Sequence, residues 1–404
     1  MFDLLKMRIE WSRERAIEFA RRLIQVASRS LSESAAATIV ADEMRKIGYD
    51  KVMQDSAGNV VGVLLGVQSG PTVLLNGHLD TVNWDESSWT HQPLGGETSD
   101  GKLFGVGAAD CKGGLAGQIY AGDLLKRSLL PFKGNLIVSA TVAEENGRSS
   151  GVRTLMEQTL PELELEPDYA VLGEPTGLNI CYGHDGWVEV EISIRGANPF
   201  QVADASQSIS QDLQCNGGAA TRFAWESRKP RLEDIPGGRL AVIQADRRLA
   251  TSDSVDSVIG QLKHEAELVV NRSGSVAVEV AICQQSRRMY TGKTMLVRHL
   301  VNAWSTDPFS PLVERARQSL SAGGCDVRAG KWELGRSGMG TAGGVLVKEY
   351  GVPTIGYGPG YEQQAHAIDE YVETAKIGQA VYGTALIAHG LIGVPVFGWT
   401  SDEI

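Results

Sequence analysis

The sequence predicts an α/β fold with a mostly parallel central sheet, interrupted by an inserted α+β domain. Residues 136–142 and 169–172 are apolar on both faces and alternate with helical patterns, which is typical of a buried parallel sheet. Residues 187–194 instead alternate strictly between apolar and polar, as a half-exposed strand does. The α/β pattern returns after about residue 293.

The first part of the chain alternates helices with strands. Helices are expected at 14–27, 32–47, 113–127 and 151–159. Strands are expected at 59–65, 72–75, 136–142 and 169–172. In the second helix, Ser32 is the predicted N-cap and Gly48 the predicted residue after the C-terminus.

The inserted segment is expected to contain helices at about 201–213 and 255–271 and strands at 187–194, 239–246 and 275–283. We therefore expect 185–292 to form the inserted domain, and 1–184 with 293–404 to form one discontinuous domain. The last part predicts helices at 310–321, 341–350 and from Asp369 onward, with a strand at 354–357.

Composition excludes several classes of partner. The 404 residues include 49 acidic and 38 basic side chains, a net charge of −11, which argues against nucleic acid or an anionic membrane as a partner. No apolar run is long enough to span a bilayer, and the N-terminus does not have the pattern of a signal peptide. The five cysteines are scattered without a CxxC pair, which predicts a reduced, cytoplasmic protein.

Metal-binding residue types follow the predicted strands, where open α/β sheets place their ligands. They are His78, Asp80, Asp110, Glu144, Glu145, Glu174 and His366, the last of which follows a Gly358-Pro-Gly360 loop. Histidine and carboxylate ligands suit zinc or a similar divalent ion. The set exceeds four ligands, which indicates two metal ions that share a bridging carboxylate. Of the adjacent Glu144 and Glu145, one can bind metal while the other acts as a general base and acid.

The order of these motifs, HxD, GxxDxKGG, EE, EPT, GPG and AH, resembles the M20 metallopeptidase family over nearly the whole chain. This family includes acetylornithine deacetylase, succinyl-diaminopimelate desuccinylase and glutamate carboxypeptidase. The segments DRRL at 246–249 and GYGPG at 356–360 are similar to the branch of acetylornithine deacetylase-like proteins and selenium-metabolism hydrolases. The resemblance implies a zinc-peptidase-like catalytic domain and a ferredoxin-like insert that serves as lid and dimerisation surface, hence a homodimer.

The resemblance also implies a role for each site residue. His78 and His366 would each bind one of two divalent ions, and Asp110 would bridge them. Glu145 and Glu174 would complete the two ligand sets. Zinc is the expected metal, with cobalt and manganese as alternatives.

The remaining roles concern the reaction and the substrate. Glu144 would be the general base and Asp80 would orient His78. Arg248 would bind the substrate carboxylate, unless it only pairs with an acid in the insert, and the loop from Gly358 to Gly360 would line the pocket. The Asp110–Cys111 peptide bond is expected to be cis.

These roles predict an amide hydrolase that acts on an N-acyl amino acid or on a small peptide with a free carboxylate. A hydroxide held between two metals would attack the amide carbonyl, with Glu144 taking and returning the proton. Three positions depart from the family pattern: Phe200 replaces a histidine that reaches across the dimer, Val106 replaces an arginine, and Ala342 replaces an aspartate. His184 is a candidate substitute for the missing histidine. The alternative is a catalytically weak or inactive homologue that binds metal and a carboxylated ligand.

Overall fold

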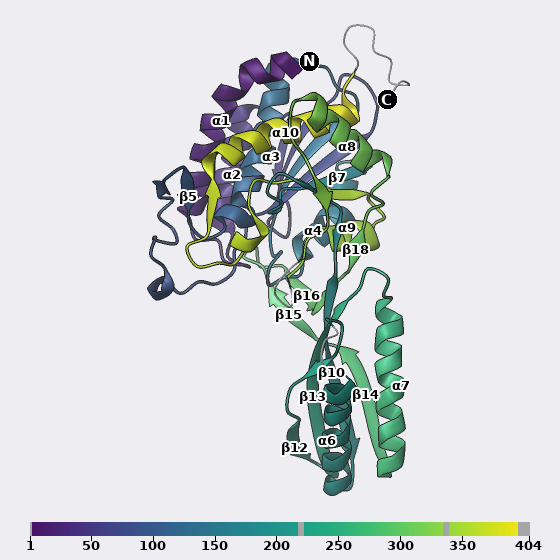
Figure 1. The fold of residues 1–404 in the computed structure, drawn as a ribbon. Coiled ribbons are helices and arrows are strands. Elements are labelled where there is room, and N and C mark those ends of the chain that lie inside the picture. The colour runs from purple at the N-terminus through teal and green to yellow at the C-terminus, as the bar shows by residue number, and fades with distance from the viewer. Residues whose placement is uncertain (1, 217–221, 334–338, 395–404) are drawn as a thin grey trace.

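The computed structural model describes residues 2–216, 222–333 and 339–394, which form a larger and a smaller lobe (Figure 1). The larger lobe contains an eight-stranded sheet in the order β1-β2-β6-β3-β7-β20-β8-β19 among the described residues. Its strands are β1 (Lys51–Gln54), β2 (Val60–Leu65), β3 (Thr72–His78), β6 (Asn135–Thr141), β7 (Tyr169–Leu172), β8 (Ile180–Cys181), β19 (Ala329–Gly330) and β20 (Thr354–Gly356). Strands β6, β3, β7 and β20 run parallel through its centre, which confirms the predicted fold class.

Helices cover both faces of this sheet. They are α1 (Phe2–Ile24), α2 (Ser34–Ile47), α3 (Gly113–Ser128), α4 (Ser150–Thr154), α5 (Leu160–Glu162), α8 (Pro311–Ala322), α9 (Gly343–Lys348) and α10 (Thr374–Ile392). Short helical segments are η1 (Glu86–Ser88), η2 (Ala108–Lys112), η3 (Leu155–Thr159) and η4 (Glu362–Gln364), and smaller sheets use β4 (Thr98–Ser99), β5 (Lys102–Phe104), β21 (Tyr371–Glu373), β9 (Gly183–His184) and β18 (Trp304–Ser305).

Strand β3 shows why the central strands carry apolar side chains on both faces. Val73 and Leu75 pack in the core with α1, α2, α3, α8 and α10, whereas Leu74 packs in the opposite core with α4 and α9. All seven residues of β3 are buried. A strand buried on both sides is fixed in register, so the side chain at its end is placed accurately.

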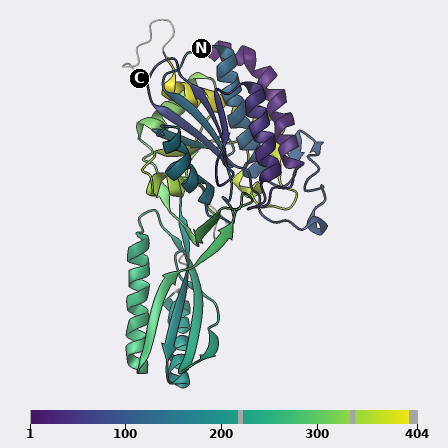
Figure 2. The same ribbon diagram turned by 180° about the vertical axis from the view of Figure 1, so that it is seen from behind.

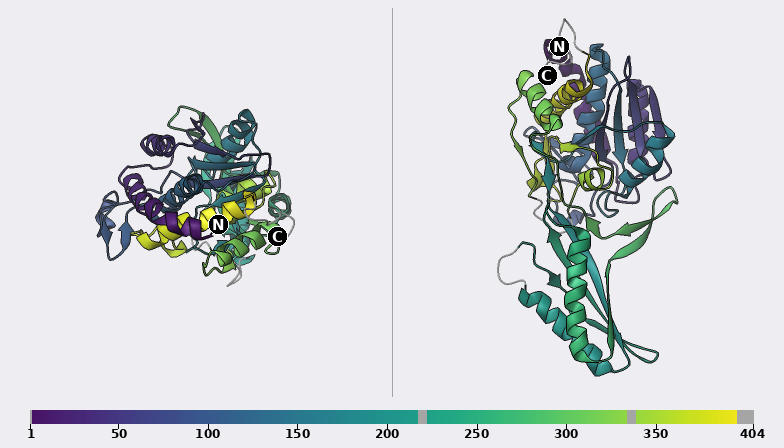
Figure 3. Two further views of the ribbon diagram at one scale, coloured as in Figure 1. Left: turned by 90° about the horizontal axis from the view of Figure 1, so that it is seen from above. Right: turned by 90° about the vertical axis from the view of Figure 1, so that its right-hand side faces the viewer.

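The smaller lobe is an antiparallel sheet covered on one face by two helices (Figure 3). Its elements are β10 (Gly186–Gly196), α6 (Pro199–Asn216), β11 (Glu226–Ser227), β12 (Arg231–Ile235), β13 (Gly238–Leu249), α7 (Val255–Ser273), β14 (Val276–Ile282) and β17 (Leu300–Val301). Val188, Val190, Ile192 and Ile194 of β10 are buried in one core with residues of both helices. This is the α+β insert that the alternating strand pattern predicts.

A hairpin returns from the smaller lobe to the larger one (Figure 2). It is formed by β15 (Gln284–Arg288) and β16 (Thr294–Arg298), and it runs across the predicted domain boundary at residue 292. At its tip, the Tyr290 hydroxyl donates to the Gly58 carbonyl (2.8 Å), and Thr291 Oγ1 donates to the Ser56 carbonyl (2.7 Å). Met289 beside them is only 2% exposed. The two lobes are therefore joined by a docked hairpin as well as by the chain itself.

Some predicted element ends are corrected by the structure. Helix α2 begins at Ser34, so Glu33 rather than Ser32 is its N-cap residue. The Glu33 carboxylate makes no cap hydrogen bond and instead accepts the N–H groups of Leu31 and Ala143. Gly48 does end this helix in the left-handed region, at φ 90°. The last helix begins at Thr374 and not at Asp369, because residues 371–373 pair with β5.

Replacement of Tyr290 by phenylalanine is expected to loosen the hairpin. The variant loses the hydrogen bonds of the hydroxyl to Gly58 and Gln54, worth about 1 kcal/mol of unfolding free energy. Hydrogen exchange should accelerate in 284–298 and 54–58 but not in helix α7. Leu296→Ala, which truncates an exposed side chain on the same hairpin, is the control. Unchanged exchange in Tyr290→Phe would show that these hydrogen bonds do not hold the hairpin.

Candidate active site

The metal-binding residue types converge at one edge of the central sheet. His78 ends β3, Glu144 and Glu145 follow β6, and Glu174 follows β7. Because these strands are parallel neighbours, their carboxyl ends meet at the same edge. Two loops complete the group by adding Asp110 from η2 and His366 after η4.

The His78 ring faces two carboxylates. Its Nε2 lies 3.1 Å from Asp110 Oδ1 and 3.9 Å from Glu174 Oε2. Its Nδ1 lies 2.8 Å from the backbone carbonyl of Asp80, and the residue is only 1% exposed. A ring held through Nδ1 presents Nε2 in a fixed direction, as metal-binding histidines do.

The second histidine approaches the same aspartate from its other oxygen. His366 Nε2 lies 3.5 Å from Asp110 Oδ2 and 2.6 Å from Glu145 Oε1. Burial opposes a charge on His366, but the hydrogen bond and the charge of Glu145 raise its pKa to about 9. Asp110 therefore lies between the two histidines with one oxygen directed at each.

These donors fit two divalent metal ions. In each of two groups, His78 with Asp110 and Glu174, and His366 with Asp110 and Glu145, the possible ligand atoms lie within 4.8 Å of one another. All are nitrogen or carboxylate oxygen, the donors that zinc and similar ions take in enzymes. The buried Cys111 thiol adjoins the first group, and burial raises its pKa to about 12, so it stays protonated. The Asp110–Cys111 peptide bond is cis, as predicted.

Asp80 holds the turn that carries the paired glutamates. Its carboxylate accepts the N–H groups of Glu144 and Glu145, each at 3.0 Å, and the Ser30 hydroxyl at 2.5 Å. Its Oδ1 is 3.6 Å from His78 Nδ1, so the backbone carbonyl rather than the carboxylate is the nearest partner of that ring. The predicted role of Asp80 toward His78 is therefore taken by its backbone carbonyl, while its carboxylate accepts hydrogen bonds from the turn and from Ser30.

Glu144 is a buried acid among other acids. It is 8% exposed, and its Oε1 accepts a hydrogen bond from Ser149 Oγ at 3.2 Å. Burial raises its pKa to about 8, and the charges of Glu145 and Asp80 act in the same direction. A carboxyl group in this range can both accept and return a proton near neutral pH.

Sequence reasoning missed two buried glutamates that support the site. The Glu370 carboxylate accepts the N–H groups of Gly107 (2.8 Å), Ala109 (2.8 Å) and Asp110 (3.0 Å). Glu33 accepts the Ala143 N–H at 3.0 Å, just before the paired glutamates. The position of Glu370, four residues after His366, was the only hint in the sequence. A carboxylate that accepts backbone N–H groups needs no particular residue types as partners, so it leaves no motif.

The Gly358–Gly360 loop packs against two ligand-bearing segments. A Cβ atom on Gly358 would lie 2.4 Å from the Glu174 carbonyl oxygen, and one on Gly360 would lie 2.5 Å from the Ala109 carbonyl oxygen. Only glycine allows this approach. The loop therefore packs behind Glu174 and Asp110, two of the predicted metal ligands.

Arg248 lies at the base of the smaller lobe. It pairs in register with Trp187, and its charged neighbours are Arg222 and Asp185, which form an ion pair at 3.2 Å. Burial lowers the pKa of the Arg248 guanidinium, and the charge of Arg222 adds to that shift. The structure therefore places this arginine on the insert and not inside the carboxylate cluster.

The structure does not support His184 as a substitute for the histidine replaced by Phe200. His184 is fully buried, its Nδ1 is 2.8 Å from the Asp185 carbonyl, and its Nε2 accepts the Thr341 N–H at 3.0 Å. Burial lowers its pKa to about 4, so the ring is neutral with both nitrogens engaged. Phe200 is 84% exposed on helix α6.

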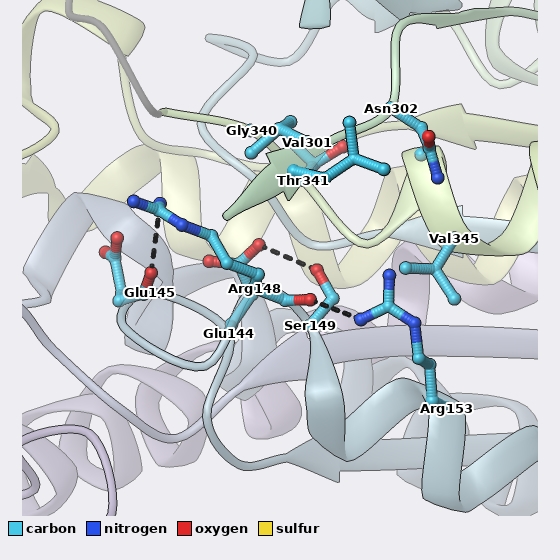
Figure 4. A pocket seen from close by; sticks show the side chains of 12 residues that line it. Glu144, Glu145, Arg148, Ser149, Arg153, Val301, Asn302, Gly340, Thr341 and Val345 are labelled. Carbon is cyan, nitrogen blue, oxygen red and sulfur yellow. Dashed lines mark hydrogen bonds between the residues drawn. The ribbon is translucent and has the colours of Figure 1, made fainter. Parts of the chain in front are cut away.

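A small cavity of about 20 Å³ lies beside the paired glutamates (Figure 4). Its lining includes Glu144, Arg148, Ser149 and Thr341. This volume holds about one water molecule.

None of the helices in the described part of the chain combines the length and the apolar composition of a membrane-spanning helix.

Comparison with known proteins gives a consistent family. The protein YgeY of Escherichia coli (strain K12) is 25% identical over 375 residues, 87% of this chain and 88% of YgeY. An acetylornithine deacetylase of Shigella sonnei is 28% identical over 382 residues, 89% of this chain and 94% of that protein. The crystal structure of Bacillus subtilis YXEP, a dinuclear metal binding peptidase, shares the fold at a TM-score of 0.68, with 15% identity over 94% of this chain and 98% of that chain. The model of peptidase family M20/M25/M40 matches residues 74–389, and the chain therefore belongs to this family of metallohydrolases that act on amide or peptide bonds.

Proposed function

We propose that this hydrolase uses two metal ions to cleave an N-acyl amino acid, or a small peptide with a free carboxylate. The observation that carries the proposal is Asp110, whose two oxygens face two separate histidines beside the buried acid Glu144. The relative named acetylornithine deacetylase favours an N-acyl amino acid as substrate.

In this proposal His78, Glu174 and Asp110 hold one ion, and His366, Glu145 and Asp110 hold the other. Zinc suits this donor set, and cobalt and manganese remain alternatives. When bound, such ions polarise a carbonyl group and lower the pKa of water from 15.7 to about 7. The backbone carbonyl of Asp80 fixes the His78 ring, and Glu370 fixes the Asp110 segment from behind.

Glu144 is the proposed general base. Its carboxylate takes the proton of the attacking water and then gives that proton to the nitrogen of the leaving amine. The Ser149 hydroxyl orients the carboxylate, and Asp80 fixes its backbone. In the metal-free protein, burial raises the pKa of Glu144 to about 8, so this carboxyl group is mostly protonated at neutral pH. Bound cations would lower that pKa and favour the carboxylate that accepts the proton.

We further propose that the smaller lobe binds the substrate carboxylate through Arg248, closes as a lid and joins two subunits in a homodimer. A guanidinium offers two parallel N–H donors that match a carboxylate. Arg248 pairs in register with Trp187 at the start of β10. This pairing places Arg248 at the end of the insert sheet that adjoins the larger lobe. Pairing of Arg248 with an acid of the insert is the competing role, and Asp185 is the acid nearby.

A second candidate function is a weak or inactive homologue that keeps its metal ions and binds a carboxylated ligand. The exposed Phe200 and the fully engaged His184 favour it, because neither offers the hydrogen-bond donor of the usual histidine. Loss of one such donor typically costs about 10²–10³ in kcat. The intact, buried Glu144 favours the hydrolase.

Replacement of Glu144 by glutamine is expected to lower kcat by about 10²–10⁴, because glutamine cannot accept the proton. Mass spectrometry would follow hydrolysis of N-acetyl, N-succinyl, N-formyl and N-carbamoyl amino acids and of dipeptides, with zinc or cobalt added. Glu162→Gln, an exposed glutamate on α5, is the matched control. Equal turnover by Glu144→Gln would exclude Glu144 as the base. Two bound metals without any turnover would favour the binding homologue.

Replacement of Glu370 by glutamine is expected to weaken metal binding by about 10–100-fold. The amide cannot accept all three N–H groups of the Asp110 segment, since its nitrogen is a donor. Calorimetric titration of metal-free protein with zinc measures the affinity, and Glu373→Gln on β21 is the control. Unchanged zinc affinity would show that the segment keeps its shape without the carboxylate.

Metal affinity is expected to rise with pH up to about 9. Below that pH the His366 ring of the metal-free protein is protonated, and the metal must displace the proton. Each pH unit between 6.5 and 8.5 should therefore raise the apparent cobalt or zinc affinity by up to about tenfold. Titrations in buffers that do not bind metal provide the test. An affinity independent of pH over this range would contradict the raised pKa of His366.

A further inference from the structure

Arg148 lies in the turn that carries the paired glutamates, directly before helix α4. Its Nη1 donates to the backbone carbonyl of Glu145 at 3.2 Å (Figure 4). Its own carbonyl accepts a hydrogen bond from Arg153 Nη1 at 2.7 Å, and Arg153 in turn forms a bidentate ion pair with Glu349. The backbone of Arg148 is thus held from α4, and its side chain is directed back over the glutamates.

The Arg148 guanidinium also contacts the smaller lobe. Its Cζ lies 5.1 Å from the centre of the Trp187 ring, and the Trp187 indole N–H donates to Asp246 Oδ2 at 2.9 Å. Burial lowers the pKa of Arg148, whereas the negative charges of Glu144 and Glu145 oppose that shift. The Arg148 guanidinium therefore lies at the junction of the lobes and lines the same water-sized cavity as Glu144.

We propose that Arg148 donates a hydrogen bond to the carbonyl oxygen of the amide under attack, and so stabilises the negative charge that develops there. This inference rests on the proposed function and adds a catalytic residue to it. The bond that forms joins the water oxygen to the carbonyl carbon. The π bond of the carbonyl breaks and its electron pair moves onto the oxygen, while the water's proton goes to Glu144. Arg148 transfers no proton. It acts through a charge-assisted hydrogen bond, which is strong where water is excluded.

The competing role for Arg148 is structural: it would only offset the charge of Glu144 and Glu145 and hold their turn. The two roles differ in which state of the reaction they stabilise. An oxyanion donor stabilises the transition state more than the bound substrate, so its loss lowers kcat and leaves KM nearly unchanged. A structural role instead predicts loss of metal or of thermal stability.

The test compares Arg148→Gln, Arg148→Lys and Arg148→Ala with wild type, using the substrate that the hydrolysis panel identifies. We expect Arg148→Gln to lower kcat by about 10²–10³, with KM within about threefold and with unchanged metal content and Tm. The methylphosphonamidate analogue of the substrate, which is tetrahedral and anionic, should lose affinity by a similar factor. Lysine should restore part of kcat, and added guanidinium should partly restore it in Arg148→Ala. Arg15→Gln is the matched control. Arg15 is also a half-buried arginine over a tryptophan, with its Cζ 4.0 Å from the centre of the Trp11 ring.

Two results would overturn the proposal while leaving the hydrolase intact. One is a kcat of Arg148→Gln that stays within about threefold of the wild-type kcat. The other is a loss of turnover that accompanies loss of metal or Tm and that neither lysine nor guanidinium restores. Absence of Glu144-dependent turnover in the wild-type protein is a separate result, which would remove the proposed function and the role of Arg148 with it.

Discussion

The position of the Asp110 carboxylate between two histidine rings is the constraint on which the rest of the site depends. Its oxygens lie 3.1 Å from His78 Nε2 and 3.5 Å from His366 Nε2, although these histidines are far apart in the chain. The parallel strands fix His78, because β3 is buried on both faces and cannot slip in register. Glu370 fixes Asp110 by accepting the N–H groups of Gly107, Ala109 and Asp110 itself.

This arrangement buries several carboxyl groups close together. Like charges and burial both disfavour ionised carboxylates, which is why the pKa values of Glu144 and Glu370 rise to about 8. Divalent cations would offset this repulsion, so metal binding and folding stability are linked in the proposed centre. Bound cations would also lower the pKa of Glu144, and so provide the carboxylate form that accepts a proton in the proposed reaction.

The sequence was informative where periodicity or strand ends carry the signal. Apolar strands such as 136–142 predicted a parallel sheet, and polar residues at their ends, such as His78 and Glu145, had to gather at one edge. Glu33 and Glu370 were missed, because each acts by accepting backbone N–H groups that only the folded chain brings near. For the same reason the sequence did not show that the Asp80 carboxylate accepts the N–H groups of Glu144 and Glu145.

Long-range docking was also beyond the sequence patterns. The alternating strand 275–283 predicted the insert, but nothing in 284–298 indicated a hairpin that returns to Gly58. Its tip residues are polar and aromatic, as in many exposed turns, and their partners lie more than 200 residues away. Such contacts depend on how two lobes meet, which local propensity does not encode.

The contacts between the lobes constrain how the proposed lid can move. The smaller lobe is joined to the larger one through the start of β10, through β17 and through the hairpin tip at Tyr290. A rigid rotation about the first two would pull Tyr290 from Gly58, so closure must either bend the hairpin or pivot near its tip. Trp187 lies at the start of β10 and faces Arg148 in the turn of the paired glutamates. In the proposed closure, movement of the smaller lobe would therefore be transmitted through Trp187 to that turn and to Arg148.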